Sequence, residues 1–122
     1  MNEQGTGRVA LVTGAGTGIG KRTSLRLLEA GYSVVLAGRR LEPLHQTVQE
    51  AGVPKSRTLV VSVDVTDPQA VEKAVADTVA HFGKIDVLAH CAGAYTVWKP
   101  IRALTAEEWT GFLDADLTGF FH

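Results

Sequence analysis

The sequence is poor in cysteine, in excess charge and in long apolar runs. Its one cysteine, Cys91, cannot form an internal disulfide and fits a reducing compartment. The longest apolar runs, such as residues 34–37, are too short to span a bilayer, and the polar start lacks the apolar stretch of a secretory signal. A formal net charge of −1 at pH 7 gives no electrostatic attraction to nucleic acid or to an anionic membrane. We therefore expect a cytoplasmic protein that binds neither nucleic acid nor membranes.

Two patterns alternate along the chain. Short β-branched runs predict strands at residues 8–13, 33–37, 58–63 and 85–89. Apolar residues at helical spacing predict helices between these strands, ending at Gly31, Gly52 and Gly83. Each strand of a parallel sheet needs such a crossover to return, so the alternation predicts an α/β fold. A length of 122 residues allows one compact core and not two, which predicts a single domain over residues 1–122.

The predicted helices have recognisable ends and apolar faces. Asp67 followed by Pro68 is typical of a helix start, and Thr105 with Glu108 has the spacing of a capping box. The first helix is expected to bury one stripe: Ile19, Thr23, Leu27 and Ala30. The third helix is expected to bury another stripe: Val71, Ala74, Val75, Thr78, Val79 and Phe82.

A glycine-rich loop, residues 13–20 (TGAGTGIG), joins the first strand to the first helix. Free backbone N–H groups and the helix dipole favour a phosphate there, and glycine lets it approach the backbone. The same glycines would also fit a tight turn that binds nothing. A P-loop needs a glycine where Ala15 stands and a Ser or Thr where Arg22 stands. The usual G-x-G-x-x-G dinucleotide spacing fails as well, because Ile19 occupies the place of its third glycine.

The loop has the form T-G-x-x-x-G-I-G, and here the sequence resembles the short-chain dehydrogenase/reductase family. Further matches follow at the family's intervals: Asp64-Val65, Ala92-Gly93, Glu108-Trp109 and residues 117–121. The resemblance implies a Rossmann-type, doubly wound parallel sheet with four strands in the order 3-2-1-4. It also implies a nicotinamide cofactor and hydride transfer to or from a small carbonyl or alcohol substrate.

The resemblance assigns a set of residues to the cofactor. The glycine loop would hold its pyrophosphate, Asp64 and Val65 its adenine, and the segment after the fourth strand the ribose on the nicotinamide side. The assigned residues are Thr13, Gly14, Gly16, Thr17, Gly18, Ile19, Gly20, Arg39, Asp64, Val65, His90, Ala92 and Gly93.

The end of the second strand distinguishes the two nicotinamide cofactors. An acidic residue about 20 positions after the glycine loop usually selects NAD by binding the adenosine ribose. Gly38 and Arg39 stand at that place here. Arg39 supplies a forked cation suited to a 2′-phosphate, and a basic residue there implies a preference for NADP(H) within the family. The alternative is that Arg39 and Arg40 are solvated charges at a helix start.

Two positions depart from the family pattern. The N-N-A-G motif reads His90-Cys91-Ala92-Gly93, and adjacent strand residues such as His90 and Cys91 point to opposite faces and cannot chelate one metal. We predict no metal site, and a small buried role for Cys91. Asp116 stands on the apolar face of the last helix, where the family usually has the asparagine of its catalytic tetrad. This carboxylate is either functional or satisfied by a local hydrogen bond or water.

The chain stops at His122 inside an amphipathic helix, and by resemblance it covers the first half of the family's domain. The fourth strand would then lie at an open sheet edge, which favours pairing with another chain and a homo-oligomer. The one Tyr-x-x-x-Lys sequence, residues 95–99, follows that strand directly, and Pro100 disfavours a helix there. We therefore do not interpret it as the family's catalytic pair.

The leading interpretation is the cofactor-binding half of an NADP(H)-dependent oxidoreductase, inactive by itself. The alternative is a non-catalytic dinucleotide-binding or interaction module.

Overall fold

The structure is a computed structural model that describes residues 6–92 and 105–113. Its strands are β1 (Val9–Thr13), β2 (Ser33–Gly38), β3 (Thr58–Ser62) and β4 (Val87–His90). Its helices are α1 (Gly18–Glu29), α2 (Leu41–Ala51), the short 3-10 helix η1 (Lys55–Arg57), α3 (Pro68–Phe82) and α4 (Ala106–Leu113). None of the helices in this described part combines the length and the hydropathy that a membrane span requires.

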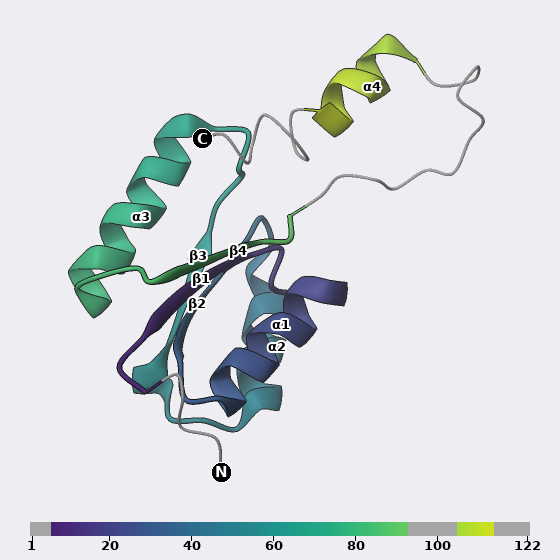
Figure 1. Cartoon of the computed structure of the whole chain (residues 1–122). Coiled ribbons are helices and arrows are strands. Elements are labelled where there is room, and N and C mark those ends of the chain that lie inside the picture. Colours follow the sequence, from purple (N-terminus) through teal and green to yellow (C-terminus); the bar gives the residue numbers. More distant parts are fainter. Residues whose placement is uncertain (1–5, 93–104, 114–122) are drawn as a thin grey trace.

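The described strands form one sheet in the order β3-β2-β1-β4, and every strand pair is parallel. Helices α1 and α2 cover one face of the sheet, and α3 covers the other (Figure 1). This arrangement confirms the predicted Rossmann-type, doubly wound sheet and its strand order. Because the strands run the same way, their carboxyl ends lie at one edge, where Thr13 is opposite both Ala37 and His90.

The hydrophobic core has one cluster on each face of the sheet. Successive residues of β1 point to opposite faces and both faces are covered, so all five residues of β1 are buried. The cluster on the side of α1 and α2 comprises Ala10, Val12, Ala15, Leu28, Val34, Leu36 and Leu44. The cluster on the side of α3 comprises Leu11, Val35, Ala37, Val63 and Ala74. The central strand therefore shares its side chains between two helical layers.

The buried face of α1 differs from the predicted one. Gly20, Ser24 and Leu28 are buried, whereas Ile19 is 80% exposed. Small residues let the helix lie close to the sheet, and the Ser24 hydroxyl donates to the Gly20 carbonyl oxygen at 2.8 Å, which satisfies it despite burial. The predicted stripe was Ile19, Thr23, Leu27 and Ala30. That prediction was wrong for Ile19, whereas Leu27 is partly buried and packs against the core; the fully buried residues lie one position further along the chain.

Apolar side chains also remain exposed on the side of α3. Ala74 and Thr78 are the buried residues of α3, while Val75 and Val79 are 38% and 46% exposed, so the predicted stripe was too wide. Leu88 on β4 is 54% exposed. Among the described strands β4 lies at the sheet edge, as the sequence predicted.

The helix ends follow the predicted signals. The carboxylate of Asp67 accepts hydrogen bonds from two backbone N–H groups in the first turn of α3. Gly52 and Gly83 follow α2 and α3 with φ angles of 63° and 86°, in the left-handed conformation that closes a helix without a Cβ clash. At α4, the Glu108 N–H donates to the Thr105 hydroxyl and the Thr105 N–H donates to the Glu108 carboxylate, at 3.0 and 3.1 Å. Both the N-cap and the capping box are confirmed.

The start of β4 is set by a side chain rather than by the strand ladder. The Asp86 carboxylate accepts a hydrogen bond from the Val9 N–H at 2.8 Å, and the Asp86 N–H donates to the Val9 carbonyl oxygen at 2.8 Å. The carboxylate thus takes a donor that the ladder would use, and β4 begins at Val87 instead of the predicted residue 85. The Val9 hydrogen bond, and after it the Lys84 ammonium 3.1 Å away, lower the pKa of Asp86.

We expect Asp86→Asn to reduce the pH dependence of stability. Because the folded-state pKa is lowered, the Asp86 carboxylate stabilises the fold at neutral pH, and this stabilisation is lost as the pH falls below about 4. The unfolding free energies of the wild type and the variant should therefore converge in urea titrations between pH 7 and pH 3. Lys84→Gln, which removes only the smaller contribution, should keep most of the wild-type slope. Parallel curves for wild type and Asp86→Asn would contradict the assignment.

Arg57 in η1 binds the end of α1. Its Nη2 atom donates to the carbonyl oxygens of Leu28 and Tyr32, at 2.6 and 2.7 Å. The last carbonyl groups of a helix have no partner within the helix, and a cation there also interacts favourably with the helix dipole. Arg57 therefore fastens the crossover between α2 and β3 to the carboxyl end of α1.

We expect Arg57→Ala to lower the unfolding free energy by about 1–3 kcal/mol, because it removes a charged donor from two carbonyl groups. Urea denaturation followed by circular dichroism measures this. Arg26→Ala is the matched control: Arg26 lies in the last turn of the same helix with an 82% exposed side chain, 3.7 Å from Glu29. Its loss should change stability by less than about 0.5 kcal/mol. Equal effects of the two variants would remove the capping role.

Candidate functional site

The candidate site lies at the edge where the strands end. Ligands of open parallel sheets bind outside the carboxyl ends of the strands. Thr13, Gly38, Ser62 and His90 are the last residues of the four described strands, and the register places them along one edge. The loops that follow these residues carry nearly all the residues assigned to a cofactor by sequence.

The glycine loop leaves the amino end of α1 open. Gly14 and Gly18 have φ angles of 62° and 54°, which turn the chain sharply from β1 into the helix. Thr17 takes the N-cap position, and within the described residues its side chain makes no capping hydrogen bond. No acidic residue occupies the first turn of α1. The first N–H groups and the positive end of the helix dipole therefore remain available to an anion.

Three glycines of the loop fit closely against three different surfaces. A Cβ on Gly14 would lie 2.8 Å from the Cys91 carbonyl oxygen, and one on Gly16 would lie 2.7 Å from the Cβ of Pro43. A Cβ on Gly20 would collide with the carbonyl group of Gly14. Real Cβ atoms do not approach other atoms so closely, so a side chain at any of the three positions would displace the loop. Gly18 alone among the loop glycines faces open space within the described part of the chain.

Helix α2 also holds the loop through a hydrogen bond. Thr47 is fully buried, and its hydroxyl lies 3.2 Å from the Ala15 carbonyl oxygen and 3.1 Å from the Pro43 carbonyl oxygen. The hydroxyl proton is shared between a carbonyl of its own helix and one of the loop. Neither Thr47 nor Pro43 was predicted from the sequence. The only signal was a threonine one turn after a proline in the first turn of α2, which is too common to indicate a site.

Thr13 joins the loop to the end of β4. Its hydroxyl oxygen lies 3.0 Å from the backbone nitrogen of Cys91 and 3.1 Å from that of Ala92. It also lies 3.1 Å from His90 Nδ1. Cys91 is half-buried and packs at the rim of the core, which is less burial than predicted. One side chain thus binds three successive residues at the end of the neighbouring strand.

The loops after β2 and β3 carry Arg39 and Asp64. The Arg39 side chain is exposed, and its carbonyl oxygen accepts a hydrogen bond from the Ser62 hydroxyl at 3.2 Å. Asp64 accepts hydrogen bonds from the N–H and the hydroxyl of Thr66 at 2.9 and 2.7 Å. These two bonds are the main cause of the lowered pKa of Asp64, and the charge of Arg39 adds to it. The site therefore holds one oriented carboxylate and an exposed guanidinium whose charge acts on it.

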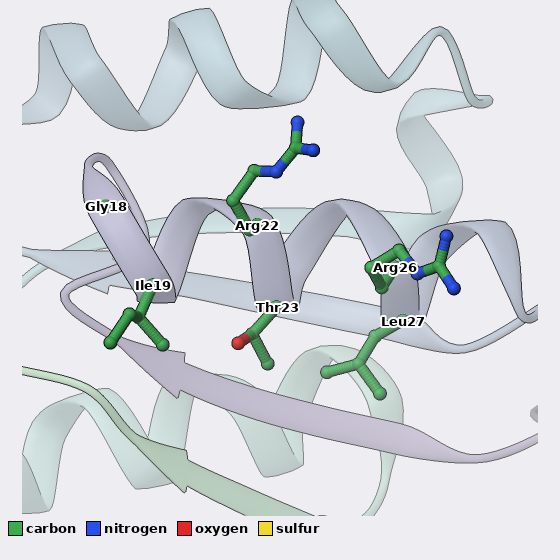
Figure 2. A pocket seen from close by; sticks show the side chains of 6 residues that line it. All are labelled: Gly18, Ile19, Arg22, Thr23, Arg26 and Leu27. Carbon is green, nitrogen blue, oxygen red and sulfur yellow. The ribbon is translucent and has the colours of Figure 1, made fainter.

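An open hollow on α1 adjoins the glycine loop. It is lined by Gly18, Ile19, Arg22, Thr23, Arg26 and Leu27. Figure 2 shows the side chains of Ile19, Thr23 and Leu27 in a row along one side of the helix, with Ile19 beside the helix start. This row is the stripe that sequence periodicity assigned to the core. An exposed apolar side chain next to an anion site suits a ligand with both a phosphate and an apolar ring.

The structure describes most of the predicted site residues, but not all of them. Thr13, Gly14, His90 and Ala92 contact one another directly or through the close approach of their backbones. Val65 is half-buried on the same loop as Asp64. Gly93, the Tyr95–Lys99 stretch and Asp116 lie outside the described residues. Within residues 6–92 and 105–113, no three His, Cys, Asp or Glu side chains are placed to share a metal ion.

Several known oxidoreductases about twice as long as this chain have similar sequences. Residues 8–122 match the family described as short chain dehydrogenase. An uncharacterized oxidoreductase of Staphylococcus epidermidis is 33% identical over 94% of this chain and 48% of its own length. The short-chain reductase NovJ of Streptomyces niveus is 39% identical over 91% of this chain and 42% of its own. The chain thus spans about half the length of these relatives.

Solved structures show the same relation. A short-chain dehydrogenase/reductase (glucose/ribitol dehydrogenase) from Brucella melitensis superposes with a TM-score of 0.90 at 29% identity, covering 99% of this chain and 50% of that one. A 3-ketoacyl-(acyl-carrier-protein) reductase from the same organism, complexed with NADH, gives a TM-score of 0.84 at 28% identity. The match covers 95% of this chain and 47% of that reductase.

We expect Thr47→Val to loosen the glycine loop. The variant keeps the side-chain volume but leaves the buried Ala15 carbonyl without the Thr47 hydroxyl, so it should cost about 1–2 kcal/mol of unfolding free energy. It should also speed hydrogen exchange of the loop amides. Thr78→Val is the matched control, because Thr78 is equally buried and, within the described residues, its hydroxyl bonds to the Ala74 carbonyl of its own helix. Faster loop exchange in both variants, or in neither, would contradict a specific link between α2 and the loop.

Proposed function

Because this chain belongs to the short chain dehydrogenase family, we propose that it is the cofactor-binding part of an NADP(H)-dependent oxidoreductase. The observation that carries the proposal is the uncapped amino end of α1, held open by a glycine loop that is packed against both α2 and the end of β4. A loop held in this way needs little reordering to accept a pyrophosphate, which favours binding. The whole unit, residues 1–122, acts as one dinucleotide-binding domain.

Each part of the proposed cofactor has a matching part of the site. The N–H groups of the glycine loop and of the first turn of α1 bind the pyrophosphate. The Ile19 side chain packs against a ring of the cofactor next to it. Asp64 and Val65 bind the adenine, and the Thr66 hydrogen bonds orient the Asp64 carboxylate for that contact. The backbone of His90, together with Ala92 and Gly93, lines the ribose on the nicotinamide side. When bound, the cofactor supplies the hydride that a carbonyl carbon accepts or an alcohol carbon gives up.

The preference for NADP(H) over NAD(H) rests on the loop after β2. Arg39 is exposed, and its charge is the smallest of the causes that lower the pKa of Asp64. A 2′-phosphate carries more than one negative charge at pH 7, so it would attract Arg39 more strongly than Asp64 does. Gly38 leaves no carboxylate there to repel it, and a Cβ at Gly38 would already lie 3.3 Å from Leu44. A relative complexed with NADH shows that both cofactors must be tested.

The catalytic part of the reaction belongs to the complete protein. By resemblance, the family's serine and its tyrosine–lysine pair would follow residue 122, and Asp116 stands at the position of the tetrad asparagine. We propose that the 122 residues alone bind cofactor weakly and catalyse nothing, and that the complete protein is a cytoplasmic homo-oligomer. NADPH oxidation with simple carbonyl compounds by the 122-residue chain would contradict the first statement.

A non-catalytic dinucleotide-binding or interaction module is the second candidate. It is favoured by His90 and Asp116, which stand where the family has asparagines. The gene beyond the codon for His122 separates the two: an in-frame serine followed by a helical Tyr-x-x-x-Lys supports the oxidoreductase, and a stop codon supports the module.

We expect Arg39→Ala to weaken NADPH binding by about tenfold or more and to leave NADH binding unchanged, because only NADPH carries the 2′-phosphate. Fluorescence titrations of the protein expressed from its intact gene measure both. Arg40→Ala is the control. Arg40 is the next residue and is also exposed, but it occupies the N-cap of α2. It should cost about twofold at most, as expected for a screened surface charge. Equal affinities of the wild type for NADPH and NADH would remove Arg39 from the proposed role.

A further inference from the structure

The hydroxyl group of Thr13 has three polar neighbours, and they use all three of its hydrogen-bonding positions. The backbone nitrogens of Cys91 and Ala92 lie 3.0 and 3.1 Å from Oγ1, and His90 Nδ1 lies 3.1 Å from it. A hydroxyl can accept two hydrogen bonds and donate one. Backbone N–H groups can only donate, so Cys91 and Ala92 use both lone pairs of the oxygen.

The third hydrogen bond, between Thr13 and His90, determines which nitrogen of the imidazole carries the proton. With both lone pairs used, the Thr13 hydroxyl can only donate its proton, and His90 Nδ1 is the neighbour that can accept it. Nδ1 must therefore carry no proton, which places the ring proton of the neutral imidazole on Nε2. A proton on Nδ1 would point at an oxygen with no free lone pair and would break one of the two backbone bonds.

We propose that His90 is a positioning residue for the cofactor loop: its Nδ1 accepts the Thr13 proton and so turns both hydroxyl lone pairs toward the Cys91 and Ala92 N–H groups. These two bonds hold the chain after β4 against Gly14, whose Cα lies too close to Cys91 to allow a Cβ. The effect on cofactor binding rests on the function proposed above. The hydrogen-bond arrangement itself does not, because every atom in it belongs to the protein.

The first test reads the imidazole directly, without cofactor. Nitrogen-15 spectra of the protein expressed from its intact gene, with the four histidines assigned by single substitution, report which ring nitrogen is protonated. We expect His90 at neutral pH to be the Nε2–H tautomer with an unprotonated Nδ1. A protonated Nδ1, in the neutral ring or in the imidazolium, would overturn the proposal.

The second test compares two replacements of His90. If His90 only fills space, the replacement closer in volume should be tolerated better; if it positions the Thr13 hydroxyl, the replacement with an acceptor should be. His90→Asn is smaller but puts a carboxamide oxygen near the position of Nδ1, whereas His90→Leu is closer in volume and has no acceptor. We expect His90→Asn to keep NADPH affinity and slow exchange of the Cys91 and Ala92 amides. His90→Leu should lose about tenfold in affinity and exchange faster, because the Thr13 proton then has no acceptor. If His90→Leu is tolerated and His90→Asn is not, His90 fills space only.

Thr13→Val completes the design. In that background no hydroxyl is left to orient, so adding His90→Leu should cause no further loss of affinity or of amide protection. Additive losses would overturn the proposal. If no variant and not even the wild type binds NADPH, the proposed function fails, while the tautomer and the amide exchange still decide the role of His90.

Discussion

β1 is buried along its whole length and pairs with a parallel strand on each side, so both of its edges and both of its faces lie inside the protein. Only the ends of such a strand, where the chain continues into loops, can reach the surface. Because its neighbours run the same way, the chain turns after β1, β2 and β4 at a common edge, and Thr13 stands between Ala37 and His90 there. The candidate site is thus a direct consequence of one central strand that has almost no exposed surface of its own.

Helix α2 connects two regions of this edge that sequence alone treats as separate. Its first turn presses Pro43 against Gly16, and Thr47 bonds to the carbonyl of Ala15. The same helix begins directly after Arg39 and Arg40, on the loop proposed for the 2′-phosphate. The position of the glycine loop and the position of Arg39 are therefore both set by the packing of a single helix.

The helix ends were predictable because each depends on local signals, whereas the strand order followed from the family resemblance. Asp67 before a proline, and glycines such as Gly83 after an apolar stripe, indicate where a helix begins or ends regardless of the rest of the fold. The buried face of α1 was not predictable in this way. Periodicity ranks side chains by hydropathy and selects Ile19, whereas close packing of the helix on the loop requires small residues such as Gly20.

Long-range hydrogen bonds were the other part that the sequence did not reveal. Thr47 bonds to a carbonyl 32 positions away, and Arg57 bonds to carbonyls 29 and 25 positions away. In each case the acceptor is a main-chain carbonyl, and every residue has one. No residue type marks the acceptor, so only the three-dimensional arrangement identifies these partners.

The bonds between Thr13 and the end of β4 also have a consequence for folding. They join residues 78 and 79 positions apart, and contacts over such distances form late because the chain between them must first be ordered. A chain leaving the ribosome can pair β1 with β2 and β2 with β3, and can form the glycine loop, before β4 has been synthesised. The loop gains its last support only when the edge strand joins the sheet. The edge proposed to bind the cofactor is thus complete only after β4 has joined the sheet, and it is the first part to be lost when β4 detaches.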